Sequence, residues 1–314
     1  MIVRFRQPLR KHGLSIALPG WGWYVVALAA HTGWGVYPVL GRYLQTVSGL
    51  PGMSVLVLGG LPLTIWLCAV VLPRHGWRMY ATPILWIFGA VTVMRSITNI
   101  LSQRYTLAIY VQLIGLLTPF IVVLLNRVVL KERAPRFTLS SLALITLGAL
   151  LMMSDISAAG MIVTLHQTDW IGIGLALTSS LFLALYMILV RRTTHTAASG
   201  VAVLAFQTVL IQLSALGLSL LWGEDWGRWR TLGARDWGVF LAYSLFVVVL
   251  ANGLQIAAIR RLGAPMVSSL MGWRLVATLG VGVLLLGEHL TSFWQGIGMV
   301  LVLSTITWYL SRQP

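Results

Sequence analysis

The sequence predicts an all-α integral membrane protein in which ten transmembrane helices form two inverted five-helix repeats. Three observations lead to this fold class. Hydrophobic residues make up 58% of the chain and charged residues only 9%, far from the balance of a soluble domain. Apolar runs of about 20 residues, the length at which a helix crosses a bilayer, nearly fill the chain. Residues 104–142 also have an ungapped echo 156 positions later, at 260–298.

Few residues are identical between the two segments, but the identical ones lie around one apolar run and the acidic residue that ends it. Glu132, for example, aligns with Glu288. Matched halves of this kind are how many membrane proteins build a site that opens to either side. The sequence therefore predicts an N-terminal repeat over 1–153, an extracytoplasmic connector over 154–169 and a C-terminal repeat over 170–314.

The ten predicted spans follow the apolar runs. The first run comes after a basic segment, as in a signal peptide, but its counterpart at 170–191 lies mid-chain, so we keep the first as a true span. In order, the spans are expected at 22–46, 52–72, 83–104, 106–130, 136–153, 170–190, 199–222, 237–259, 264–286 and 293–311.

Lysine and arginine gather on one side of the predicted membrane. They occupy 4–11, 74–78, 127–136, 191–192, 260–261 and 312 there, against 42, 104 and 228–235 on the other side. The positive-inside rule makes the basic side cytoplasmic, which places both termini inside and inverts the two halves. We therefore expect a multi-pass protein of the inner (plasma) membrane. Topology and lipid headgroups explain the net charge of +15, so no nucleic-acid partner is expected.

Three segments carry a resemblance to a known family. The runs TPFIVVLLNRVVLKERAPRFTLSSLALITLGALL at 118–151 and VGVLLLGEHLTSFWQGIGMVLVLSTITWYL at 281–310 each reach Leu-x-Glu and then a further helix, and AAHTGWGVYPVLGRY at 29–43 holds a Trp-Gly pair. With these motifs the sequence resembles the EamA-type families of the drug/metabolite transporter superfamily. The resemblance implies a secondary transporter, not an enzyme. It also implies a cavity lined by the first four helices of each half, with the fifth and tenth helices at the periphery.

Two arginines fall inside predicted spans, Arg274 near the middle of the ninth and Arg95 slightly past the middle of the third. All seven acidic residues lie in loops or at helix ends, so no carboxylate at membrane depth offsets these charges. A charge at the bilayer centre costs about 2.5–3.5 kcal/mol on insertion scales. Such an arginine most simply faces a watery cavity that receives a carboxylate or phosphate. Bonding to backbone carbonyls, or reaching out to the membrane surface, is the structural alternative.

Further polar and aromatic residues at membrane depth extend the predicted substrate site. Asn99 shares a helix face with Arg95, and His31, Trp34 and Tyr37 form one stripe on the first span. The other candidates are Trp273, Tyr110, Gln112, Tyr186, Gln207 and Asn252. Asparagine and glutamine in spans also serve simply to join helices.

Two of the motifs leave alternatives open. His31 is either a proton carrier or, the commoner case, a neutral histidine that joins helices. Glu132 and Glu288 lie at opposite membrane faces, where helix capping or loop pairing is the simpler role.

The sequence thus predicts a secondary transporter, and an exporter as is common in the family, of a small metabolite with a carboxylate: an amino acid, a derivative or another organic anion. Efflux of cationic or neutral drugs is the alternative, which the two arginines oppose, and a membrane-embedded enzyme is a third. The chain has no phosphate loop of the GxxxxGK type and no metal-ligand cluster in sequence, so no cofactor and no metal are expected. We expect a monomer in the lipid bilayer acting on a small-molecule substrate.

Overall fold

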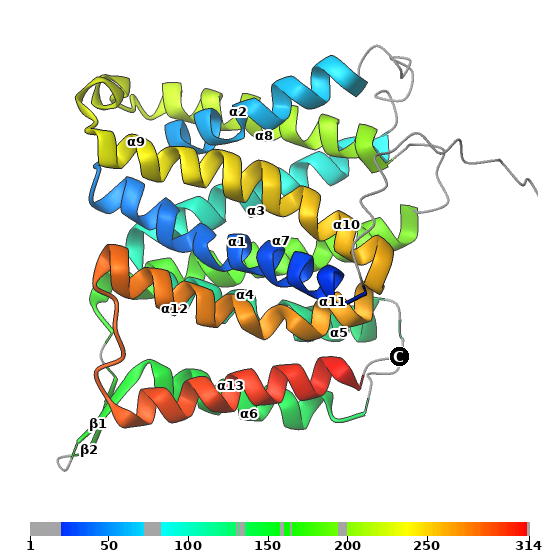
Figure 1. Cartoon of the computed structure of the whole chain (residues 1–314), viewed down its shortest axis with the longest axis vertical. Helices are drawn as coiled ribbons and strands as arrows, with labels where there is room; N and C mark the ends of the chain where they lie inside the picture. Colours follow the sequence, from blue (N-terminus) through cyan, green and yellow to red (C-terminus); the bar gives the residue numbers. More distant parts are fainter. Residues whose placement is uncertain are drawn as a thin grey trace, which may run out of the picture.

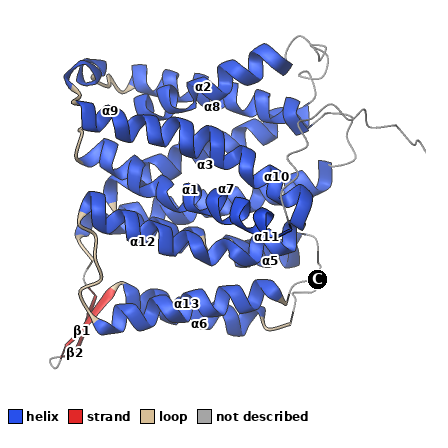
Figure 2. Ribbon diagram, in the orientation of Figure 1, coloured by secondary structure: helices blue, strands red, loops and turns tan. Residues whose placement is uncertain are grey.

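The computed structural model describes residues 20–71, 83–129, 131, 136–157, 160–163, 165–193 and 200–312. Glu132 and the basic residues before Gly20 lie outside these ranges. The helices run side by side across a single bundle, with a short hairpin projecting at one corner (Figures 1 and 2).

The first half contains six helices and the second half seven, within the described residues. They are α1 Gly20–Thr46, α2 Gly52–Val71, α3 Pro83–Tyr105, α4 Ala108–Gly115, α5 Thr118–Val129, α6 Thr138–Met152, α7 Gln167–Thr193, α8 Gly200–Leu221, α9 Ala234–Leu241, α10 Asn252–Leu262, α11 Ala264–Ser269, α12 Trp273–Leu286 and α13 Phe293–Ser311. Shorter elements are the 3-10 turns η3 Trp226–Thr231 and η5 Leu270–Gly272, the π-helical η4 Ala242–Ala251, and strands β1 Ser154–Ser157 and β2 Gly160–Val163.

Eight helical stretches in the described ranges are long and apolar enough to cross a membrane. α6 is apolar but only 15 residues long, and α1 is long but is not among the eight. Glycines and polar residues such as His31, Arg42 and Gln45 interrupt the apolar character of α1. Each predicted span overlaps at least one helix, and a helical membrane protein is confirmed. The count of ten spans and their inversion remain predictions.

The expected spans at 106–130 and 264–286 each contain a short tightened turn within one apolar helical stretch, Ala108–Val128 and Met266–Leu286. α4 and α5 are separated at Leu116 and Leu117, whose amides bond three residues back to Leu113 and Ile114. The second is the 3-10 turn η5, which ends at Gly272. The two turns fall at the same place in the sequence repeat, since residue 116 aligns with residue 272.

The molecule has two ends that face away from each other. The hairpin end carries β1–β2, η3 and the loop before α13, and the opposite end carries the C-terminus (Figure 1). β1 and β2 pair antiparallel, with Ser154 opposite Val163. The sequence reading did not anticipate this hairpin, which lies within the expected connector.

Helices α6 and α13 form a separate layer packed against each other (Figure 1). They approach closely at Gly148 and Gly298, where a Cβ on Gly298 would lie 2.5 Å from the carbonyl oxygen of Gly148. This peripheral position of the fifth and tenth predicted helices is the one implied by the resemblance. α1, by contrast, lies inside the bundle and contacts α3, α4, α10, α12 and η4.

Candidate functional site

The central helix α1 is enclosed along one half and accessible along the other. From Gly33 to Gln45, toward the hairpin end, every residue is buried except Trp34, Tyr37 and Arg42. Toward the opposite end the helix is more open, and Trp21 is 70% exposed. Trp34 and Tyr37 are therefore partly accessible side chains in the middle of an otherwise buried stretch.

Arg274 is held against α1 by His31. The Nε of Arg274 donates to Nδ1 of His31 over 3.0 Å, and Nε2 of His31 donates to the Val267 carbonyl over 2.8 Å. Because a carbonyl can only accept, the His31 proton must lie on Nε2, and Nδ1 is the acceptor. Both ring nitrogens of this fully buried histidine are thus committed. This arrangement is that of a neutral histidine that positions Arg274.

α1 and α12 can approach this closely because residue 35 is a glycine. A Cβ at Gly35 would collide with the carbonyl oxygen of Arg274 and lie 2.9 Å from Cβ of Ala277. The Thr278 hydroxyl donates to the Gly35 carbonyl over 2.6 Å, which fixes the contact one turn further along α12.

The guanidinium of Arg274 lies at one edge of an aromatic cluster. Its Cζ lies 5.8 Å from the centre of the Trp34 ring, and the Trp34 and Tyr37 rings are 6.0 Å apart. Tyr37 stacks on Tyr243 of η4 at 5.3 Å, and the Tyr243 hydroxyl donates to that of Tyr37. Nε1 of Trp34 is buried and has no hydrogen-bond partner among the described residues.

Arg95 of α3 belongs to the same group of side chains. It interacts electrostatically with Tyr37 and Tyr186, and its charge also acts on Arg274. Both arginines are partly buried. Among the described residues, no carboxylate lies within 4 Å of either guanidinium. Positive charges on α3 and α12 therefore interact with each other, and neither has a carboxylate partner among the described residues.

Not all of the predicted candidates join this group. The side-chain oxygen of Asn99 accepts from Nε2 of Gln103 over 2.9 Å, which ties it to the hairpin end of α3 rather than to Arg95. Tyr110 and Gln112 are buried on α4, and Tyr110 belongs to the apolar cluster that also contains Phe120 and Leu275.

Three further candidates come from the second half of the chain, and of these Trp273 contacts α1 beside His31. Gln207 is buried on α8, and its Nε2 has no partner among the described residues. Asn252 donates to the Val248 carbonyl one turn before it. Trp273 is 42% exposed, and its ring nitrogen donates to the Thr32 hydroxyl over 2.9 Å.

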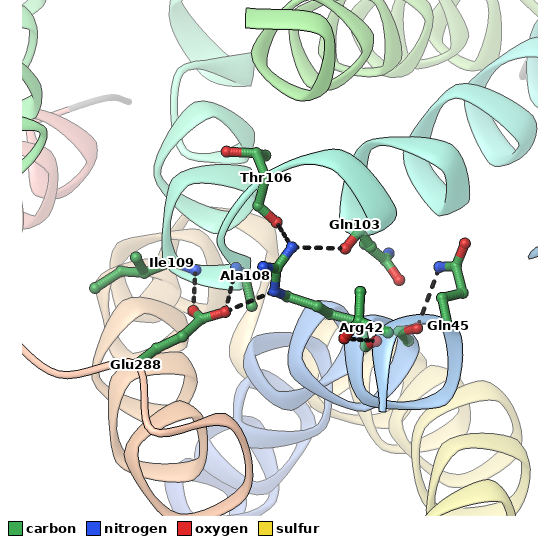
Figure 3. A network of polar contacts seen from close by, with 9 residues as sticks. Arg42, Gln45, Gln103, Thr106, Ala108, Ile109 and Glu288 are labelled. Carbon is green, nitrogen blue, oxygen red and sulfur yellow. Dashed lines mark hydrogen bonds and ion pairs between the residues drawn. The ribbon is translucent and has the colours of Figure 1, made fainter. Parts of the chain in front are cut away.

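A second polar cluster closes the hairpin end of the bundle (Figure 3). Nε of Arg42 lies 3.0 Å from Oε1 of Glu288, and the two side chains are only 20% and 6% exposed. Glu288 also accepts from the backbone amides of Ala108 and Ile109, at 3.1 and 3.3 Å, and so caps α4. We call Arg42, Glu288 and these two amides the hairpin-end latch.

The guanidinium of Arg42 extends the latch to the end of α3. It donates to the carbonyls of Gln103 and Thr106, the first over 3.3 Å. These are carbonyls that the end of a helix leaves without intrahelical partners. The latch thus joins α1, α3, α4 and the end of α12.

Burial raises the pKa of the Glu288 carboxyl, while the Ala108 amide and Arg42 act against that shift by favouring the carboxylate. The expected capping role of Glu288 is therefore observed, but its partner Arg42 was not anticipated. Arg42 and Glu288 were both predicted at the same membrane face, and this was the sequence signal from which their pairing could have been predicted.

Glu224 builds a similar cap nearby. Its carboxylate accepts from the amides of Met53 and Ser54 at 3.0 and 2.9 Å and from the Ser219 hydroxyl at 2.7 Å. The indole of Trp229 donates to the Ser54 hydroxyl. The hairpin end is therefore joined by buried polar contacts as well as by apolar packing.

Comparison with known proteins gives a family. Residues 170–311 match the EamA-like transporter family. The chain carries an EamA domain. The match confirms the expected resemblance to EamA-type proteins over the C-terminal half, and it supports a membrane transporter of the drug/metabolite transporter superfamily. Transporters of the EamA family are generally not enzymes.

Solved structures support the fold across both halves. Nineteen solved chains match this one. One of them, titled only "Crystal structure of protein", aligns over 94% of this chain and all of its own length, with a TM-score of 0.59 and 15% identity. At that identity the likeness extends to the fold alone. A search among curated proteins finds no match.

Proposed function

We propose that this EamA protein moves a small organic anion across the membrane by alternating access, and that Arg274 and Arg95 bind it. The observation that carries the proposal is that the Arg274 guanidinium lies over Trp34, interacts electrostatically with Arg95, and like Arg95 has no carboxylate partner among the described residues. A buried charge without a partner is costly, so it is retained where it binds an opposite charge.

The proposed alternating-access mechanism is based on the two inverted repeats. Ten spans in two inverted halves place the hairpin end outside and the more basic end in the cytoplasm. The turns at equivalent places near residues 116 and 272 support the repeat, because discontinuous helices recur at equivalent places in inverted-repeat transporters. The latch then closes the outer end, and the more open half of α1 gives access from the cytoplasm. A site loaded from inside and released outside corresponds to export.

Substitution of the arginines tests the proposal. Purified protein in detergent is heated with succinate or with putrescine, and unfolding is followed by the reaction of Cys68, the single cysteine, with a thiol dye. Succinate is expected to raise the midpoint in the wild type and not in Arg274→Gln. The matched control is Arg228→Gln, because Arg228 is 61% exposed on η3 and pairs with Asp225 instead.

Two results would contradict the proposal. Putrescine could stabilise the protein while no organic anion does, which would favour the cation efflux alternative. Alternatively, Arg274→Gln could respond to succinate as the wild type does, which would remove the arginine from the site.

A further inference from the structure

We infer that the site takes a dianion, a dicarboxylate or a phosphate monoester, in preference to a zwitterionic amino acid. This inference rests on the proposed function and names its substrate class.

The site has two positive charges to neutralise. Arg274 on α12 lies over the Trp34 ring of α1, and Arg95 on α3 is near enough to interact electrostatically with both Tyr37 and Arg274. A single carboxylate neutralises one of the two arginines and leaves the other unpaired in a partly buried place. Two negative charges on one molecule neutralise both. Guanidinium forks also suit carboxylate and phosphate oxygens better than any neutral group.

An ammonium group finds no place in this cluster. Within the described residues, the carboxylates near α1 are Glu288 and Asp236, both at the hairpin end and already bonded to Arg42 and Ser48. An ammonium can also sit on an aromatic face. However, the Trp34 face receives Arg274, and the Tyr37 ring stacks on Tyr243. A zwitterion would bring its positive charge next to two guanidiniums.

The free hydrogen-bonding capacity of the cluster is mostly donor. Nε1 of Trp34 is a buried N–H without an acceptor, and no hydrogen bond of the Arg95 guanidinium joins it to a described residue. The hydroxyl of Tyr37 accepts from Tyr243, so its own proton is available. Both nitrogens of His31 are used. A ligand rich in acceptor oxygens satisfies these donors, and one that brings an ammonium adds further donors.

The test uses four-carbon probes that differ in charge. Succinate is a dianion, succinamate a monoanion of nearly the same shape, 4-aminobutyrate a zwitterion and putrescine a dication. Glycerol 3-phosphate tests whether the dianion is a phosphate monoester. Affinities are measured by isothermal titration with the full-length protein in detergent at constant ionic strength, because salt weakens contacts between charges.

In the wild type, at least one dianion should bind about tenfold or more tightly than succinamate, since a charged hydrogen-bonding partner is lost. 4-Aminobutyrate should bind more weakly still. In Arg95→Gln the dianion should fall to the affinity of succinamate, while succinamate itself changes little. Arg228→Gln is the matched control and should bind every probe as the wild type does. The comparison between succinate and glycerol 3-phosphate then assigns the type of dianion.

The failures of the two proposals are distinguishable. If 4-aminobutyrate or succinamate binds as tightly as both dianions, or if Arg95→Gln keeps the full dianion preference, the dianion inference is wrong and an Arg274-dependent anion site still stands. If only putrescine binds, both proposals fail. Absence of measurable binding of both dianions at millimolar concentration also overturns the inference.

Discussion

Glu288→Gln is the substitution that most directly tests the hairpin-end latch. Glutamine keeps the size of the side chain and one acceptor oxygen, but it removes the negative charge opposite Arg42. Its NH₂ group would also face a backbone N–H of Ala108 or Ile109, where a carboxylate oxygen now accepts. The substitution therefore removes an ion pair and one capping hydrogen bond from a place where Glu288 is only 6% exposed.

The expected loss of stability is about 2–3 kcal/mol, the value of a lost hydrogen bond to a charged group. Glu288→Ala should cost more, roughly 3–5 kcal/mol, because it breaks a buried pair and leaves both amides without an acceptor. The thiol-dye unfolding midpoint in detergent measures the effect. Glu224→Gln is the matched control, since Glu224 also accepts from two amides but has no described arginine within 4 Å.

A double-mutant cycle isolates the ion pair. Arg42→Gln alone should also destabilise the protein, because the α3 carbonyls lose their donor and Glu288 loses its counter-charge. In the double variant the losses should be less than additive by about 1 kcal/mol or more. Strict additivity would refute the claim that these two side chains stabilise each other.

Glu288→Gln also tests whether the hairpin-end latch keeps the outer end of the protein closed. Val39 is fully buried one turn below Arg42. In a Cys68→Ser background, a cysteine at position 39 should react slowly with an impermeant maleimide added outside. Glu288→Gln should speed that reaction severalfold, because the closed state loses stability. If the rate stays the same although the midpoint falls, the latch only stabilises the fold and does not gate the site.

Two further predictions concern the contact between α1 and α12. His31→Leu should lower stability by about 1–3 kcal/mol and weaken succinate binding, because Nε of Arg274 loses its acceptor. His31→Gln keeps one donor and one acceptor and should retain most of the binding. If His31→Gln binds succinate normally but no longer transports it, His31 is instead a proton carrier. Gly35→Ala should destabilise by about 1–3 kcal/mol, because its Cβ collides with the Arg274 carbonyl, whereas Gly174→Ala meets nothing within 4 Å and should be neutral or slightly stabilising. Equal melting midpoints for the two alanine variants would show that α1 and α12 do not approach as described.

The helices could be predicted from sequence because the apolar runs that a bilayer requires are also long enough to define each helix. The turns after Gly115 and at Gly272 were not predicted, although a glycine stands at each and Ser268 and Ser269 precede the second. An interrupted helix and a continuous one of the same composition have the same hydrophobicity. Pro119, in the first turn of α5, is a further local signal that a new helix begins there.

The site was only partly predictable for a related reason. Spacing along one helix placed Trp34 and Tyr37 on a common face, and their rings are indeed neighbours. The bond from Arg274 to His31 joins residues 243 positions apart, and no spacing rule encodes it. Asn99 shares a face with Arg95, yet its neighbour Gln103 bonds to it. Periodicity gives the face of a helix but not the partner that faces it.

The lack of a described carboxylate beside Arg95 and Arg274 has a consequence for the transport cycle. When a dianion is bound, the central charge is close to zero, and the loaded protein can change conformation with little electrostatic penalty. When the site is empty, two positive charges must pass through the same rearrangement inside the bilayer, where each is costly. If the proposed site is correct, we expect return of the empty protein to be the slow step. A carrier with this charge balance works fastest when it releases one anion and takes up another before turning back, so the proposed site favours exchange over one-way release.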